Sequence, residues 1–205
     1  MGNMPAFAPA PPRTLTKSEQ SRLLKVTGDH RAGFRDHVIF ALALGTGLRE
    51  HEIAGLNVGD VRHADGRVLR RVVLRVFKRS AGKPAPQDVF LPEALWHKLS
   101  KFVAWKQARG ERLDPSAPLF MSRRGGRIAT RTLRHLFGVW QARAGFDHRF
   151  NFHSLRHTSL TNAYRATRDI RLVQRIARHK NIETTTIYAA VADEDLFLAT
   201  RHLPC

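Results

Sequence analysis

Cysteine is almost absent from this sequence: the only one, Cys205, is the last of 205 residues. An internal disulfide is therefore excluded, and a reducing interior, the cytoplasm, is the expected compartment. No apolar run approaches the roughly 18 residues that a membrane-spanning helix needs. The N-terminus also lacks the charged and continuous apolar regions of a signal peptide. We therefore expect neither a membrane segment nor a membrane partner.

Acidic residues are scarce. The chain has 17 Asp and Glu against 35 Lys and Arg, which gives a formal net charge of +18. An excess of this size favours a polyanionic partner, because neutralising phosphates releases bound counterions. Hydrophobic residues at 42% and charged residues at 25% are typical of a globular chain. Composition thus predicts a nucleic-acid-binding protein.

The beginning of the chain changes character near residue 14. Four prolines within the first twelve residues, without periodicity, predict a disordered Pro/Ala-rich lead-in over residues 1–13. Thr16 and Glu19 then have the spacing of a helix capping box. Residues 34–47 are apolar nearly all round and predict a buried helix, ended by a glycine turn.

The rest of the chain predicts a small sheet followed by helices. Residues 60–92 contain an Asp-Gly turn, a β-branched run and a Gly/Pro-rich loop, which favour a three-stranded antiparallel sheet. Helical patterns follow at 93–110, from a Thr130 cap to Gly145, and at 153–167, 169–179 and 193–201. The order predicts an α+β fold that is mainly α.

The stretch FHSLRHTSLTNAY, residues 152–164, holds the densest chemistry. His153 and His157 are four apart and would share a helix face, as a metal-binding pair does. Zincins need H-E-x-x-H, however, and Ser154 stands in place of the glutamate, so no metal site is expected. Two alternatives stay open: an anion-binding pair of His153 with Arg156, or an ordinary polar helix surface.

Chemically capable side chains also occur elsewhere. Arg49 follows a glycine turn, Lys78 ends a strand before a loop, and Tyr188 comes nine residues after His179. Arginine forks match phosphate oxygens, tyrosine is a covalent nucleophile, and lysine or histidine can protonate a leaving alkoxide. Together they are compatible with phosphotyrosine chemistry but do not establish it. Singly, each has an ordinary structural explanation, and Lys83 could replace Lys78.

Four motifs in this order resemble the catalytic domain of the tyrosine recombinases, which include phage integrases, Xer-type recombinases and fimbrial-switch invertases. TGLREHEI is similar to that family's T-G-L-R-x-x-E box, and HSLRH to its H-x-L-R-H box. His179 follows His153 by 26 residues, and Tyr188 lies in TTTIY. The resemblance covers nearly all of residues 14–205 and implies that family's catalytic fold.

The resemblance implies that Tyr188 attacks the scissile phosphate of double-stranded DNA, forming a 3′-phosphotyrosyl link and a free 5′-hydroxyl. Arg49 and Arg156 would clamp the non-bridging oxygens. Since the phosphotyrosine preserves the bond energy, strand exchange would need no ATP, metal or other cofactor. The enzyme would be a site-specific DNA recombinase of the integrase or invertase type, as on a mobile element.

The remaining catalytic roles are implied in the same way. Lys78 would protonate the leaving 5′-oxygen, His153 would accept the tyrosine proton, and His179 would donate a hydrogen bond to the phosphate. Glu52 would orient the first arginine box, and His157 would be a buried structural neighbour. A further group of arginines offers DNA-backbone contacts: Arg123, Arg124, Arg127, Arg131 and Arg134.

The sequence departs from the family in three places. Only about thirteen residues precede the catalytic domain, so the usual core-binding domain is expected to be absent. The family's Leu-Gly-His is Ala177-Arg178-His179 here, so the helix end loses its glycine. The hairpin that carries Lys78 is longer than usual, which leaves Lys83 as a rival.

Assembly follows from the same resemblance. A homotetramer on paired DNA sites is expected, with a monomer or weak oligomer in the absence of DNA, helped by accessory proteins at the bacterial nucleoid. The segment after Tyr188 would dock on a neighbouring protomer or fold back on its own domain. Two other functions stay open: a catalytically silent DNA-binding regulator, and a topoisomerase-like relaxing enzyme.

Overall fold

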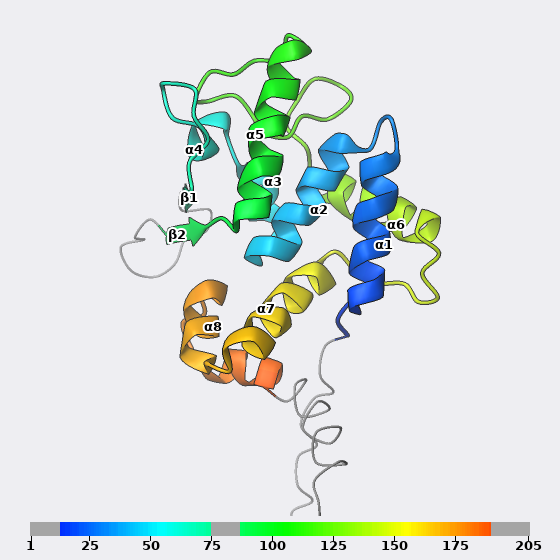
Figure 1. The fold of residues 1–205 in the computed structure, drawn as a ribbon, viewed down its shortest axis with the longest axis vertical. Helices are drawn as coiled ribbons and strands as arrows, with labels where there is room; N and C mark the ends of the chain where they lie inside the picture. The colour runs from blue at the N-terminus through cyan, green and yellow to red at the C-terminus, as the bar shows by residue number, and fades with distance from the viewer. Residues whose placement is uncertain (1–12, 75–86, 190–205) are drawn as a thin grey trace, which may run out of the picture.

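The computed structural model describes residues 13–74 and 87–189 as a mainly helical protein with a small antiparallel sheet (Figure 1). Its elements are α1 (Lys17–Asp29), α2 (Phe34–Thr46), α3 (Glu50–Gly55), α4 (Val58–Val61), β1 (Arg71–Leu74), β2 (Gln87–Phe90), α5 (Glu93–Ala108), α6 (Thr130–Arg143), α7 (His153–Thr167) and α8 (Ile170–Ala177). Residues 183–189 are helical as well. The expected fold class, α+β and mainly α, is confirmed.

Helix α2 lies at the centre of the molecule, where it packs against α1, α5 and α7. Its side chains Val38, Ile39, Phe40 and Leu42 are fully buried, as an all-round apolar helix requires. Helix α1 begins at the predicted capping box, in which the Glu19 amide donates to the Thr16 hydroxyl at 3.2 Å. Because α2 is buried at the centre, the position of the turn that follows it, at Gly47, is fixed as well.

The core has two parts. The larger surrounds α2 and includes Phe40, Phe137 and Phe152, whose rings meet at centroid distances of 5.6 to 6.2 Å. The smaller joins α7, α8 and the 183–189 helix, which lie together at the lower end of the view in Figure 1. Tyr188 belongs to this smaller cluster, so the predicted nucleophile is also a packing residue.

The described part of the sheet has two strands rather than the three expected. β1 pairs antiparallel with β2, with Val72 opposite Val89. The expected third strand is replaced by α4 and a loop in which Arg62 and Val68 form a single bridge. The Asp60 carboxylate accepts from the Asn57 amide at 2.7 Å and so favours a helical turn where a strand was predicted.

Two helix limits test the sequence interpretation. Helix α7 begins and ends where the pattern predicts, at 153 and 167. The Thr130 cap is wrong: Ala129 occupies the N-cap position without a side-chain hydrogen bond, and Thr130 is the first helical residue. Lys78, Lys83, residues 1–12 and the predicted 193–201 helix lie outside the described residues. No helix of the described ranges is long and apolar enough to cross a membrane.

Candidate active site

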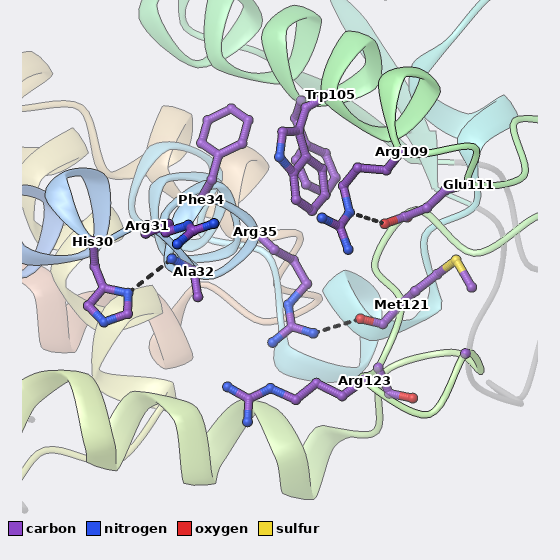
Figure 2. Close-up of a pocket in the computed structure, with 13 residues that line it drawn as sticks. His30, Arg31, Ala32, Phe34, Arg35, Trp105, Arg109, Glu111, Met121 and Arg123 are labelled. Carbon is purple, nitrogen blue, oxygen red and sulfur yellow. Dashed lines mark hydrogen bonds and ion pairs between the residues drawn. The ribbon is translucent and has the colours of Figure 1, made fainter.

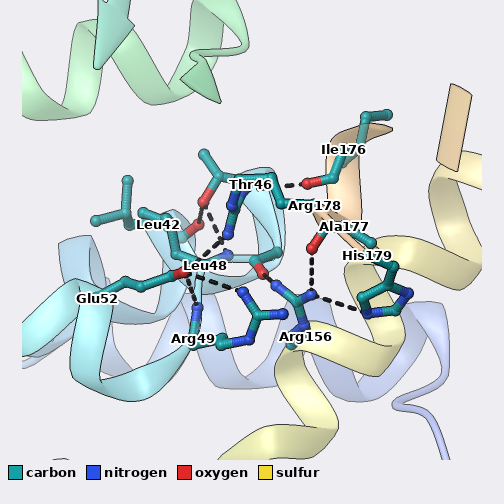
Figure 3. Close-up of polar contacts among 11 residues, drawn as sticks. Leu42, Thr46, Leu48, Arg49, Glu52, Arg156, Ile176, Ala177, Arg178 and His179 are labelled. Atoms are coloured by element: carbon teal, nitrogen blue, oxygen red, sulfur yellow. Dashed lines mark hydrogen bonds and ion pairs between the residues drawn. The ribbon is translucent and has the colours of Figure 1, made fainter. Parts of the chain in front are cut away.

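A tight turn between α2 and α3 positions Arg49. Gly47 ends α2 with φ of 63°, a left-handed conformation that glycine adopts without strain. A Cβ there would also meet the Leu160 side chain at 3.3 Å. Arg49 then becomes the N-cap of α3, and its backbone amide donates to Glu52 Oε2 at 2.7 Å. The turn thus directs the guanidinium toward α7 and α8 (Figure 3).

Arg156 connects three segments from a buried position, with 2% of its surface exposed. Its Nη1 donates to the Gly47 carbonyl, and its Nη2 donates to the Ala177 carbonyl at 2.6 Å (Figure 3). Nη2 also lies 3.2 Å from His179 Nε2. Burial and the positive charge of Arg49 lower the pKa of Arg156 to about 10, so it remains protonated at neutral pH.

Glu52 is the counter-charge of this arginine cluster. It is 5% exposed, and its carboxylate accepts from Arg49 Nη1 at 3.1 Å and from Arg178 Nη2 at 2.7 Å. Burial by itself would raise the pKa of Glu52, but Arg178, the Arg49 amide and the Arg49 guanidinium outweigh burial and lower it. The carboxylate is therefore ionised at neutral pH and holds two guanidinium groups.

Tyr188 lies in the 183–189 helix with 1% of its surface exposed. Its hydroxyl oxygen is 3.2 Å from His157 Nδ1, and its ring is near-parallel to the His179 ring at a centroid distance of 6.3 Å. Burial raises the pKa of Tyr188, while Arg156 and Arg49 act in the opposite direction. The hydroxyl is protonated at neutral pH and therefore needs a base to become a nucleophile.

His157 was expected to be a buried structural neighbour, and its contact with Tyr188 was not predicted. Its ring centroid lies 4.6 Å from that of His153 and 5.8 Å from that of Tyr188. The i,i+4 spacing placed the two histidines on one face. The contact with Tyr188 spans 31 residues and left no local signal. His153, the first residue of α7, is only partly covered, and this partial burial together with nearby Arg156 lowers its pKa.

Two histidines next to Tyr188 are neutral at pH 7. Burial, reinforced by neighbouring positive charges, lowers the pKa of both His157 and His179 to about 4. A neutral imidazole with its proton on Nε2 can accept a hydroxyl proton at Nδ1. The described residues contain no group of three or more His, Cys, Asp or Glu side chains that could hold a metal ion. The site's chemistry is thus cationic and imidazole-based.

Five of the six predicted catalytic residues come together in this cluster, and the sixth, Lys78, lies outside the described residues. A family model described as the Phage integrase family matches residues 13–195. This chain belongs to that family. It is 34% identical over 167 residues to the tyrosine recombinase XerC of Corynebacterium efficiens, and 31% identical over 179 residues to that of Vibrio vulnificus.

The two alignments cover 82% and 86% of this chain but only 50% and 52% of the two relatives. The chain thus spans about half the length of the curated relatives it matches. The crystal structure of XerA recombinase superimposes with a TM-score of 0.76 at 26% identity, over 97% of this chain and 68% of that one. A XerH site-specific recombinase bound to palindromic difH substrate gives 0.73 at 19% identity, over 98% and 57%, and supports the fold alone.

The five arginines expected to contact DNA differ in their surroundings in this phage integrase family member. All five are classed as exposed. Arg127 nevertheless donates to the Ala54 and Leu56 carbonyls at 3.1 and 2.9 Å, and Arg134 forms an ion pair with Glu50. Both already have protein partners, which leaves Arg123, Arg124 and Arg131 as the stronger DNA-contact hypotheses.

A separate hollow of about 660 Å³ lies between the α1–α2 turn, the end of α5 and the 121–125 turn (Figure 2). Arg31, Arg35 and Arg123 line it together with Phe34 and Trp105. None of its lining residues belongs to the arginine–histidine–tyrosine cluster, and none is a tyrosine. The hollow therefore lacks the nucleophile that the cluster provides.

The two neutral histidines predict how stability depends on pH. Their folded pKa values of about 4 lie below the ordinary 6.5, so the unfolded chain binds more protons between these values. Stability is therefore fully present above pH 6.5 and falls as the pH drops toward 4. Because both rings are partly exposed, we expect a loss of roughly 1–2 kcal/mol per histidine. Urea unfolding at pH 7 and pH 4.5 measures it.

Replacing His157 with glutamine should make the difference between the two pH values smaller. His148→Gln, at an exposed position on the 145–150 loop, is the matched control and should leave the difference as in the wild type. Equal pH dependence in His157→Gln and the wild type would contradict the low pKa of His157.

Proposed function

We propose that this chain cleaves and rejoins double-stranded DNA as a site-specific recombinase of the integrase or invertase type. One observation supports this most strongly. The Tyr188 hydroxyl contacts a neutral histidine at 3.2 Å, while Arg156 contacts His179, the ring that stacks on the same tyrosine. A nucleophile from the 183–189 helix thus meets a base and a phosphate-binding guanidinium that both come from α7.

In the proposed reaction the Tyr188 oxygen attacks the scissile phosphorus and loses its proton to an imidazole. His153 was expected to take this proton, and His157 contacts both His153 and the tyrosine hydroxyl. The bond from phosphorus to the 5′-oxygen breaks, and Lys78 is proposed to protonate that oxygen. The product is a 3′-phosphotyrosine, and the 5′-hydroxyl of another strand reverses the step with no net loss of a phosphodiester.

Charge stabilisation is assigned to Arg49 and Arg156. Negative charge grows on the non-bridging oxygens as phosphorus becomes five-coordinate, and guanidinium forks match such oxygens. Both arginines lie beside the histidine–tyrosine pair, and the excess of arginine over carboxylate in the cluster leaves positive charge for an anion. His179 is proposed to add a hydrogen bond to the phosphate.

The proposed partner is double-stranded DNA, with four copies of the chain on two paired sites and with accessory proteins. The net charge of +18 supports a polyanion. The similar XerH recombinase is bound to a difH substrate in its crystal structure, and the Tn1549 transposon integrase is bound to a circular intermediate DNA, which supports DNA for this chain too. The bacterial cytoplasm, at the nucleoid, is the proposed compartment, consistent with the lone Cys205.

The test is to trap and map the covalent intermediate. The protein is mixed with nicked duplexes whose sequence is that of the DNA flanking its gene. The nick lets the 5′-hydroxyl fragment diffuse away after cleavage, and a 5′ label on the cleaved strand marks the fragment that stays on the protein. A labelled band that migrates with protein on a denaturing gel is expected, and peptide mapping should place the nucleotide on Tyr188. Attachment to Tyr164, or DNA binding without any adduct, would contradict the proposal; the second result would favour the silent regulator.

A further inference from the structure

Arg178 occupies a backbone position that favours glycine. It caps α8 with φ of 55° and ψ of 44°, in the left-handed region where a Cβ is strained. Arg168 is the other non-glycine residue with positive φ in the described ranges, and its side chain is exposed. The Arg178 side chain is only 5% exposed. An unfavourable backbone that also buries a charge calls for a specific interaction in return.

That interaction is with Glu52. Arg178 Nη2 donates to Glu52 Oε2 at 2.7 Å, and Nη1 donates to the Ile176 carbonyl at 3.1 Å (Figure 3). The same carboxylate oxygen accepts from the Arg49 amide at 2.7 Å. One carboxylate therefore joins Arg178, the residue before His179, to Arg49, the N-cap of α3.

The geometry points to Arg178 as a positioning residue for DNA strand cleavage. Its ion pair with Glu52 holds the turn that carries His179 against the turn that carries Arg49, so that both face one phosphate. This inference rests on the proposed function and deepens it. Arg156 forms the neighbouring link, from α7 to the Ala177 carbonyl. Two buried arginine side chains, one from α7 and one from the C-cap of α8, thus bind carbonyls at the same helix end.

Arg178 acts through Glu52 rather than on the DNA itself. Its side chain is almost fully covered, and two of its nitrogens are already hydrogen-bonded to protein. Its Nε is buried and has no hydrogen-bond partner among the described residues, so the pairing is maintained although one donor is unsatisfied. The ion pair is thus kept although an unsatisfied buried nitrogen lowers local stability. This indicates that the role of Arg178 is to link the two turns.

The test compares Arg178→Gly with Arg178→Met. Glycine relieves the backbone but removes the ion pair, whereas methionine keeps the strained backbone and a similar side-chain length. Single-turnover cleavage of a nicked duplex, at saturating protein, is measured beside the DNA dissociation constant. Both variants should cleave at least about tenfold more slowly, with DNA affinity changed less than about threefold. All measurements are made below the melting transition of each variant.

Glycine at the wild-type rate would overturn the inference, because backbone strain alone would then explain the site. Should methionine fail to fold, the glycine variant still decides. A further check adds Glu52→Gln: the double variant with Arg178→Gly should cleave no more slowly than Glu52→Gln alone, since both changes remove one link. Wild-type protein that forms no adduct on any duplex would defeat the proposed function instead, so the two failures are distinguishable.

Discussion

Tyr188→Phe should abolish the covalent protein–DNA adduct, with a fall of at least about 1,000-fold in cleavage and DNA affinity within about twofold of the wild type. Phenylalanine keeps the ring that packs among Leu160, Val173 and Ala177, so the small core cluster survives. What disappears is the hydroxyl oxygen, which is 3.2 Å from His157 Nδ1. The measurement is a denaturing gel of nicked-duplex reactions beside a gel-shift titration.

Tyr164→Phe is the matched control, because Tyr164 is the other tyrosine of the chain and packs against the same cluster. It should form adduct at the wild-type level. If the Tyr188→Phe protein still gave a denaturant-resistant adduct, another side chain would have to be the nucleophile. If it lost DNA binding together with cleavage, Tyr188 would be established only as a packing residue.

Glu52→Gln should lower the free energy of unfolding by about 3–5 kcal/mol. Glu52 is the buried carboxylate between Arg49 and Arg178, and Arg156 lies within its electrostatic reach. Without it, guanidinium groups that repel one another remain in a desolvated cluster. Urea unfolding at pH 7 measures the loss. Added sulfate should restore part of it, because an anion can occupy the space among the guanidinium groups.

Glu50→Gln, two residues earlier, is the control for Glu52→Gln. Glu50 pairs with Arg134, whose side chain is largely exposed, so the expected loss is below about 1 kcal/mol. Equal losses in the two variants would show that burial of the Glu52 ion pairs contributes nothing beyond a surface pair. A loss in Glu52→Gln that sulfate does not reduce would contradict the anion-binding role of the cluster.

Local sequence signals predicted the fold well wherever the determining contacts were local. The Thr16–Glu19 capping box and the limits of α7 depend on residues within a few positions, and both are as expected. The missing strand before β1 had an equally local cause that was overlooked, the pairing of Asp60 with the Asn57 amide. The three-strand prediction relied on the Asp-Gly turn, the β-branched run and the Gly/Pro-rich loop, and did not consider this capping contact.

The site was less predictable because its contacts cross the chain. Arg49, Arg156 and His179 could be chosen from motif order, but the carbonyls that Arg156 binds could not, since they lie 109 and 21 residues away. Arg127 has the appearance of a DNA-contact arginine in the sequence, yet it donates to two carbonyls at the end of α3. In a chain this basic, composition cannot separate structural from ligand-binding arginines.

Arg178, which stands where the family usually has glycine, also shows that local sequence cannot reveal a distant partner. The sequence predicted trouble at the helix end before His179, because a side chain there disfavours the left-handed turn. The turn forms nevertheless, with φ of 55°, and the arginine finds its partner 126 residues away in Glu52. Local propensity identified the position, and a distant carboxylate decided its conformation.

The carbonyl contacts of Arg156 bear on how inactive descendants of such proteins would look. In a descendant without catalytic activity, replacing Tyr188 with phenylalanine would cost little folding stability, because the ring alone fills the smaller core cluster. Exchanging Arg156 would leave the Gly47 and Ala177 carbonyls without their donor and would undo the junction of three segments. Selection for mere folding would therefore preserve Arg156 long after catalysis had ended. In genome surveys, Tyr188 and not Arg156 is therefore the position that distinguishes active enzymes from inactive family members.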